Sequence, residues 1–393
     1  MTKSFATRLG DIQPFRVMEL LARANALQAA GHQVIHMEVG EPDFSTPEPI
    51  IRAGERALHD GQTRYTPAQG IPALREAISR HYQDTQGVDV APERIFVTAG
   101  GSGALLLCSA LLLDPGQGLL MTDPGYPCNR HFLKAFSGEG QLVPVTASER
   151  YQLTPELIDR YWADNTRGVM LASPSNPTGA MLSSAEMAAI AETVRRRQGF
   201  LVADEIYHGL TYDEPAISAL VSDPDAFVVN SFSKYFGMTG WRLGWLVVPD
   251  NAIRDVEKLA QNLFICPSSI SQSAALAAFT AQAKEIMERQ KEEFRQRRDF
   301  LAPALAELGV GVPLMPDGAF YVYGRLGDGL PDSETFCHRA LEEQFVAVTP
   351  GTDFGFHEAD RHVRFSYAQQ LDLLEQGVER IAAAIRNQSG TAS

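Results

Sequence analysis

Seven short apolar runs, most of them separated by helical stretches, constrain the fold of this chain more than any other feature. Near-continuous apolar strands that alternate with helices are typical of a mostly parallel sheet covered on both faces. We therefore expect an α/β fold, with a three-layer αβα large domain around a mostly parallel seven-stranded sheet. The predicted strands are 94–99, 118–122, 141–146, 167–172, 200–204, 226–231 and 243–248.

Two helical segments lie between these runs. The longest apolar stretch, 103–113, is far too short to span a bilayer and is expected to form a buried helix. The segment 185–198 has helical periodicity, and Gly199 follows it in the place of a C′ glycine.

The pattern changes after about residue 283. Because 393 residues exceed what one core usually organises, we expect two domains, with the charged amphipathic helix 285–308 bridging them. The smaller, α+β domain should contain a helix near 16–28 and strands at 319–323, 345–348 and 362–367. The expected division is a large domain at 46–285 and a small domain formed by 1–45 and 286–393.

Composition excludes several classes of function. The formal charge of -14 argues against a nucleic-acid partner, which needs a basic surface. The first residues lack the apolar core of a secretory signal, and no run is long enough for a membrane span. The cysteines are widely spaced and the histidines show no ligand pattern. We therefore expect a cytoplasmic protein with reduced thiols and no metal site.

The residues that follow the strands carry the chemistry, because open α/β sheets bind ligands beyond the carboxyl ends of their strands. Gly100–Gly103, GGSG, opens a helix and could present backbone amides to an anion, although such turns are mostly structural. Tyr126 could lie on a flat ligand or cap the core. Asn176 sits in a proline-rich turn. Asp204 closes an apolar strand, where a carboxylate is costly unless it meets a cation.

The segment after the sixth strand is the most informative. Lys234 is flanked by Ser231 and Ser233, and Arg242 follows eight residues later, in a loop that joins two apolar strands. A lysine desolvated there can lose its proton and act as a nucleophile. Serine hydroxyls and a guanidinium are good partners for a phosphate.

Together these motifs resemble the class I aminotransferases, the aspartate-aminotransferase-like group of fold type I pyridoxal-phosphate enzymes. The resemblance rests on SNPTG at 175–179, DEIY at 204–207 and SFSKxxxMxGWRLG at 231–244. It runs from GEPDFSTPE at 40–48 to RFS at 364–366, and so covers most of the chain. Each motif is modest alone, but the set in this order is specific.

The resemblance implies a role for each matching residue. Lys234 would carry pyridoxal 5'-phosphate as a Schiff base and move the proton at the substrate's Cα, while Asp204 would pair with the pyridine nitrogen. Asn176 and Tyr207 would hydrogen-bond the phenolic oxygen, and Tyr126 would stack on the ring. The phosphate would be held by Gly101, Ser102, Ser231, Ser233 and Arg242, with Tyr65 reaching the phosphate of a neighbouring subunit in a homodimer.

The substrate anchors are implied in the same way. Arg364 would fork the α-carboxylate, with the Gly40 amide and Asn176 beside it. Some relatives with aspartate activity carry a lysine where this chain has Ser102, so that route to a distal carboxylate is missing. Arg16 could substitute for it; alternatively, aromatic side chains could make the pocket suit apolar or aromatic donors. The candidates are Phe15, Phe320 and Tyr323.

The expected reaction is ping-pong transfer of the amino group of an L-amino acid to a 2-oxo acid, with 2-oxoglutarate the expected acceptor. A carbon–sulfur β-lyase or an aminocyclopropane-carboxylate-synthase-like enzyme would share Lys234, Asp204 and Arg364, so these alternatives stay open. A non-catalytic pyridoxal-phosphate-binding regulator usually has a DNA-binding domain, for which this chain leaves no room. The absence of GxGxxG argues against a nicotinamide dehydrogenase.

Overall fold

The computed structural model describes residues 5–389, and its centre is a seven-stranded sheet in the order β2-β8-β7-β6-β5-β3-β4. Only β8 runs antiparallel to its neighbours, and the other pairs are parallel. All seven predicted runs are strands of this one sheet, which confirms the expected fold class. Their bounds are β2 Ile95–Thr98, β3 Gly118–Asp123, β4 Glu139–Pro144, β5 Thr166–Ala172, β6 Phe200–Asp204, β7 Phe227–Ser231 and β8 Gly244–Val247.

Helices cover both faces of the sheet. Alternate residues of a strand enter two separate cores: in β7, Val228 joins one and Val229 the other. The predicted buried helix is α4, Gly100–Leu112, which lies on the Val229 side, whereas α7, Ser184–Arg196, lies on the Val228 side. The other helices of this region are α2 Glu48–His59, α3 Pro72–Gln86, α5 Pro127–Ala135, α6 Pro155–Tyr161, α8 Ile253–Leu263 and α9 Ser269–Ala275.

The end of α7 differs in detail from the expectation. Gln198, with φ 56°, is the left-handed residue, and Gly199 follows it with its amide bonded to the Val194 carbonyl. The prediction of Gly199 as the C′ residue was therefore wrong by one position. A Cβ at Gly199 would lie 2.4 Å from the Trp162 ring, so the glycine is needed for close packing.

A smaller α+β region follows. Its four-stranded sheet has the order β12-β13-β10-β9, and a separate pair joins β1 to β11. The predicted run 345–348 contains β11 of the separate pair, whereas β12 of the four-stranded sheet begins directly after it, at Thr349. The N-terminal helix α1, Arg16–Ala29, contributes Ala24 and Leu27 to a core shared with Leu341 and Ala347. The remaining bounds are β1 Ile35–His36, β9 Val310–Gly311, β10 Tyr321–Leu326, β11 Val346–Ala347, β12 Thr349–Pro350, β13 His362–Ser366, α11 Ser333–Gln344 and α12 Leu371–Ser389.

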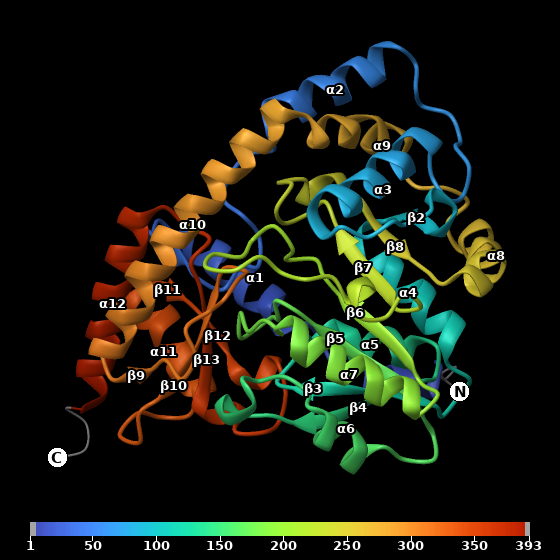
Figure 1. Ribbon diagram of the computed structural model, residues 1–393. Helices are drawn as coiled ribbons and strands as arrows, with labels where there is room; N and C mark the ends of the chain where they lie inside the picture. Colours follow the sequence, from blue (N-terminus) through green and yellow to red (C-terminus); the bar gives the residue numbers. More distant parts are fainter. Residues whose placement is uncertain (1–4, 390–393) are drawn as a thin grey trace.

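Helix α10, Ala281–Glu307, connects the two regions and runs from beside α2 and α9 down to α12 in Figure 1. Its first turns bury Met287 in a core of the large sheet, and its last turns bury Leu301 in the core of the small one. The division near residues 45 and 285 stays a proposal. Short 3-10 helices complete the described chain at Thr7–Asp11, Pro92–Arg94, Ala147–Glu149, Ala219–Val221, Thr239–Trp241, Asp250–Ala252, Leu276–Phe279, Gly351–Asp353 and Ala359–Arg361.

None of the helices within residues 5–389 is both long and apolar enough to cross a bilayer. In the same part of the chain, no three His, Cys, Asp or Glu side chains form a group that could hold a metal ion. All four cysteines are free.

Candidate active site

A cavity of about 320 Å³ lies at the carboxyl ends of the parallel strands, where the large sheet meets α1 and the small sheet. Of the residues to which the resemblance assigns a role, all except Tyr65 line it. The predicted residues in its wall are Gly40, Gly101, Ser102, Tyr126, Asn176, Asp204, Tyr207, Ser231, Ser233, Lys234, Arg242 and Arg364. Tyr65 lies on the surface and is 82% exposed.

Lys234 follows β7 and reaches across to the loop after β1. Its Nζ donates a hydrogen bond to the Gly40 carbonyl at 2.5 Å and lies 5.7 Å from the centre of the Phe320 ring. Burial lowers the pKa of Lys234 to about 8, with Glu41 opposing that shift and Arg364 adding to it. A substantial fraction of this amine is therefore neutral, and nucleophilic, near physiological pH.

Asp204 closes β6 beside that lysine. Its side chain is buried, and Oδ1 accepts a hydrogen bond from the Ile206 amide at 3.2 Å. Burial raises the pKa of Asp204 to about 7, while the Ile206 amide and Lys234 lower it. A buried carboxylate of this kind should bind a cationic group of a ligand, because the cation offsets the cost of burying the negative charge.

The opposite wall is shaped for an anion. Ser231 Oγ accepts from the Ser233 amide at 3.1 Å and donates to Ser233 Oγ at 3.0 Å, so both hydroxyls meet at one point. Arg242 has φ 54°, and its guanidinium lies so close to Gly100 that a Cβ there would be 2.8 Å from Nη2. Helix α4 begins at Gly100 and directs the positive end of its dipole into the same corner.

Arg364 is the largest buried cation of the small sheet. Its Nη1 donates to Asn176 Oδ1 at 3.0 Å, and its Nη2 donates to the Glu38 carbonyl. Its guanidinium carbon lies 4.3 Å from the centre of the Tyr321 ring. Its Nε is buried and has no hydrogen-bond partner within residues 5–389. A fixed, partly unsatisfied guanidinium of this kind is suited to fork a carboxylate.

Sequence reasoning missed Tyr321, whose hydroxyl lies 2.9 Å from the Tyr207 hydroxyl and lines the cavity. Of the aromatic candidates for the substrate pocket, only Phe15 lines the cavity, with its ring edge-on to Tyr126 at 6.0 Å. Phe320 and Tyr323 are buried but do not line it.

Arg16 also lies outside the cavity wall. Its guanidinium forms an ion pair with Glu334 and donates to Thr352 Oγ1 at 3.3 Å. The hypothesis that Arg16 binds a distal carboxylate is therefore not supported by its position.

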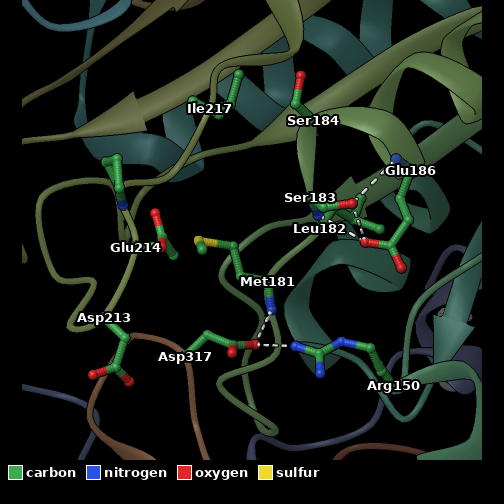
Figure 2. Close-up of a pocket in the computed structure, with 11 residues that line it drawn as sticks. Arg150, Met181, Leu182, Ser183, Ser184, Glu186, Asp213, Glu214, Ile217 and Asp317 are labelled. Atoms are coloured by element: carbon green, nitrogen blue, oxygen red, sulfur yellow. Dashed lines mark hydrogen bonds and ion pairs between the residues drawn. The ribbon is translucent and has the colours of Figure 1, made fainter.

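A second hollow, of about 370 Å³, contains none of the predicted site residues. Figure 2 shows Asp317 between the Arg150 guanidinium, at 2.7 Å, and the Met181 amide, at 2.9 Å. These bonds tie the loop after β5 to the loop before β10. We interpret the contact as a connection between the two regions of the fold.

Comparison with known proteins identifies the family. The model of "Aminotransferase class I and II" matches residues 32–381. The chain belongs to this family. This aminotransferase is 38% identical to a valine–pyruvate aminotransferase of Mycobacterium tuberculosis, over 99% of this chain and 100% of that protein. It is 36% identical to a (5-formylfuran-3-yl)methyl phosphate transaminase of Methanocaldococcus jannaschii, over 95% and 97% of the two chains.

A solved structure agrees with the assignment. An aminotransferase from Mycobacterium tuberculosis matches with a TM-score of 0.94 and 37% identity, covering 98% of this chain and 100% of that chain. The expected α/β fold and the transaminase activity are therefore confirmed for this aminotransferase.

Proposed function

We propose that this aminotransferase uses pyridoxal 5'-phosphate attached to Lys234, with the site residues acting as the family resemblance implies. The observation that carries the proposal is the single cavity that brings the buried Lys234 amine together with Asp204 and Arg364. When bound, the cofactor supplies a carbonyl that takes up the donor's amino group and a ring that withdraws electrons from Cα. The remaining steps depend on side chains of this chain.

The cavity fits the cofactor at its phosphate end. A Cβ at Gly244 would lie 2.7 Å from the Gly100 carbonyl carbon and 2.9 Å from the Gly101 amide nitrogen, so glycine alone lets these segments approach. The start of α4, the Ser231 and Ser233 hydroxyls and Arg242 then offer several donors and a positive charge to one anion. Ser102 lines the same wall.

Asp204 fits the ring nitrogen. At about 3 Å and an effective dielectric near 20, its attraction to a protonated ring nitrogen is roughly 5 kcal/mol before desolvation. The buried carboxylate, whose pKa burial raises to about 7, gains the cation it lacks. Tyr126 would cover the ring, while Asn176 and Tyr207 would hold its phenolic oxygen; the bond between the Tyr207 and Tyr321 hydroxyls supports the orientation of Tyr207.

Arg364 would hold the substrate's α-carboxylate through a two-point contact, with the Gly40 amide beside it. Holding the carboxylate there would place Cα next to Lys234, whose amine, once free of the cofactor, would remove the Cα proton and later return one. Asn176 is bonded to Arg364 and therefore links the substrate anchor to the cofactor side of the cavity.

A homodimer with shared sites is part of the proposal. Tyr65 is too exposed to serve the cavity of its own chain, and its ring would be buried by a second subunit. A Tyr65→Phe variant should bind the cofactor less tightly without loss of dimer mass. The expected cytoplasmic location stays a prediction.

The names of the relatives differ in their substrates, so family membership leaves the donor open. The test of the reaction class is product analysis. Purified enzyme supplied with pyridoxal 5'-phosphate and an amino acid should release a new amino acid only when a 2-oxo acid is added. Release of ammonia and pyruvate without an added 2-oxo acid would favour the β-lyase alternative instead.

A further inference from the structure

One side of the candidate cavity is apolar and is formed by α1 and by Phe15, the residue just before it. Phe15, Val17, Met18 and Leu21 line it; we call these four residues the α1 wall. Val17, Met18 and Leu21 share one face of the helix, because Leu21 lies three and four residues, about one turn, after the other two.

The α1 wall lies on the Arg364 side of the cavity. Helix α1 packs on β11 and β12, and Thr349 of β12 lies 3.5 Å from Arg364 Nη2. The Arg16 amide, within the same turn, donates to Asp353 Oδ1 at 3.2 Å. A substrate held by Arg364 at its α-carboxylate would therefore lie within reach of these four residues.

The cations in the cavity wall are already assigned to groups of the cofactor or to the substrate's α-carboxylate. Within the described chain, these cations are Lys234, Arg242 and Arg364. The proposed function assigns them to the cofactor carbonyl, the phosphate and the α-carboxylate. The wall also contains the carboxylate of Glu41, which repels a further anion.

Two further arginines lie close but face other groups. Arg16 is paired with Glu334 outside the cavity. Arg130 lines a neighbouring hollow behind Tyr126, with its guanidinium 5.4 Å from the centre of the Phe356 ring. Burial lowers the pKa of Arg130, while Asp353 and Asp123 raise it. A second carboxylate on the substrate would thus meet the α1 wall, where the described residues of this chain supply no cation, which is unfavourable.

We propose, building on the function proposed above, that the site selects amino donors with apolar side chains and 2-oxo acids with a single carboxylate. Donors of the size of leucine, methionine or phenylalanine would bury their side chains against the α1 wall. Pyruvate and branched-chain 2-oxo acids would then be better acceptors than 2-oxoglutarate. This differs from the acceptor that the sequence resemblance led us to expect.

The test is the first half-reaction of the cofactor-loaded enzyme, followed by its absorbance change with one donor at a time. Leucine, methionine and phenylalanine should each give a second-order rate constant at least about tenfold above those of aspartate and glutamate, because an unpaired second carboxylate forfeits charge-assisted hydrogen bonds. With leucine as donor, pyruvate should likewise exceed 2-oxoglutarate in kcat/KM. Faster conversion by acidic donors would overturn this inference alone, whereas no conversion by any donor would overturn the proposed function.

A pair of variants locates the selectivity. Met18 is 55% exposed, so a longer polar side chain can be accommodated there. Met18→Arg should raise the rate constant of aspartate relative to that of leucine by about threefold or more, the size of a partly exposed ion pair. Met18→Gln is the control of similar length without charge and should leave acidic donors disfavoured. An unchanged ratio in Met18→Arg would show that the donor side chain does not lie along the α1 wall.

Discussion

Replacing Asp204 with asparagine should stabilise the cofactor-free enzyme while it impairs catalysis. The side chain is buried, and burial raises the pKa of Asp204 from 3.8 to about 7. An acid whose pKa is higher in the folded chain than in the unfolded chain loses stability as the pH rises between those values. Asparagine has the same shape and keeps an oxygen for the Ile206 amide, which now donates to Asp204 Oδ1.

The magnitude follows from the two pKa values. At about 1.36 kcal/mol for each pKa unit, burial of Asp204 costs the folded protein about 4 kcal/mol at pH 8, where the carboxylate is ionised, and about 2 kcal/mol at pH 5, where it must take up a proton. At roughly 2 °C per kcal/mol, cofactor-free Asp204→Asn should melt about 8 °C above wild type at pH 8 and about 4 °C above it at pH 5. Below pH 4 the two proteins should melt together.

The same change should weaken the loaded enzyme. If half of the roughly 5 kcal/mol attraction to the ring nitrogen acts in the transition state, kcat falls about 100-fold. Melting curves with and without pyridoxal 5'-phosphate at both pH values, together with steady-state rates, measure both effects. Asp225→Asn, at an exposed position, is the control and should show no pH-dependent gain. A cofactor-free Asp204→Asn protein that melts below wild type at pH 8 would refute the reasoning.

Three further predictions concern other walls of the cavity. Because burial lowers the pKa of Lys234 to about 8, the rate at which the cofactor-free enzyme takes up pyridoxal 5'-phosphate should rise with pH and level off above about 8; a stopped-flow profile still rising at pH 10 would contradict this. Arg364→Lys should raise the KM for donors by at least about tenfold, since a lysine cannot fork a carboxylate, and wild-type KM values in that variant would exclude the proposed anchor. Gly244→Ala should bind the cofactor at least about tenfold more weakly, because the new Cβ would collide with Gly100 and Gly101. Cofactor affinity is measured by equilibrium titration, and an unchanged affinity would show that this close approach is not needed.

The large sheet was predictable because its strands are buried on both faces and therefore appear as continuous apolar runs. Their carboxyl ends meet at one edge of a parallel sheet, so the residues after β6 and β7 could be expected together. The antiparallel direction of β8 could not, since an apolar run has the same pattern in either direction. Its neighbour β7 is joined to it by the loop that contains Lys234.

The substrate side of the cavity was less predictable, because it depends on contacts between distant segments. Arg16 forms an ion pair with Glu334, which lies more than three hundred residues away in the sequence. No sequence pattern around either residue indicates this pairing. Tyr321 lines the cavity, whereas its neighbour Phe320 does not, although its ring lies near Lys234. Which of the two residues faces the cavity depends on how β10 is oriented toward the large sheet. The individual roles of the site residues stay predictions.

The most direct test of the account is to identify the residue that carries the cofactor. The wild-type enzyme loaded with pyridoxal 5'-phosphate should show an absorbance band between 300 and 500 nm, and borohydride reduction followed by peptide mass mapping should find the adduct on Lys234. Lys234→Ala supplied with the same cofactor should lack both the adduct and donor-dependent loss of the band. An adduct on an exposed lysine such as Lys258, or amino transfer by Lys234→Ala at the wild-type rate, would contradict the central claim.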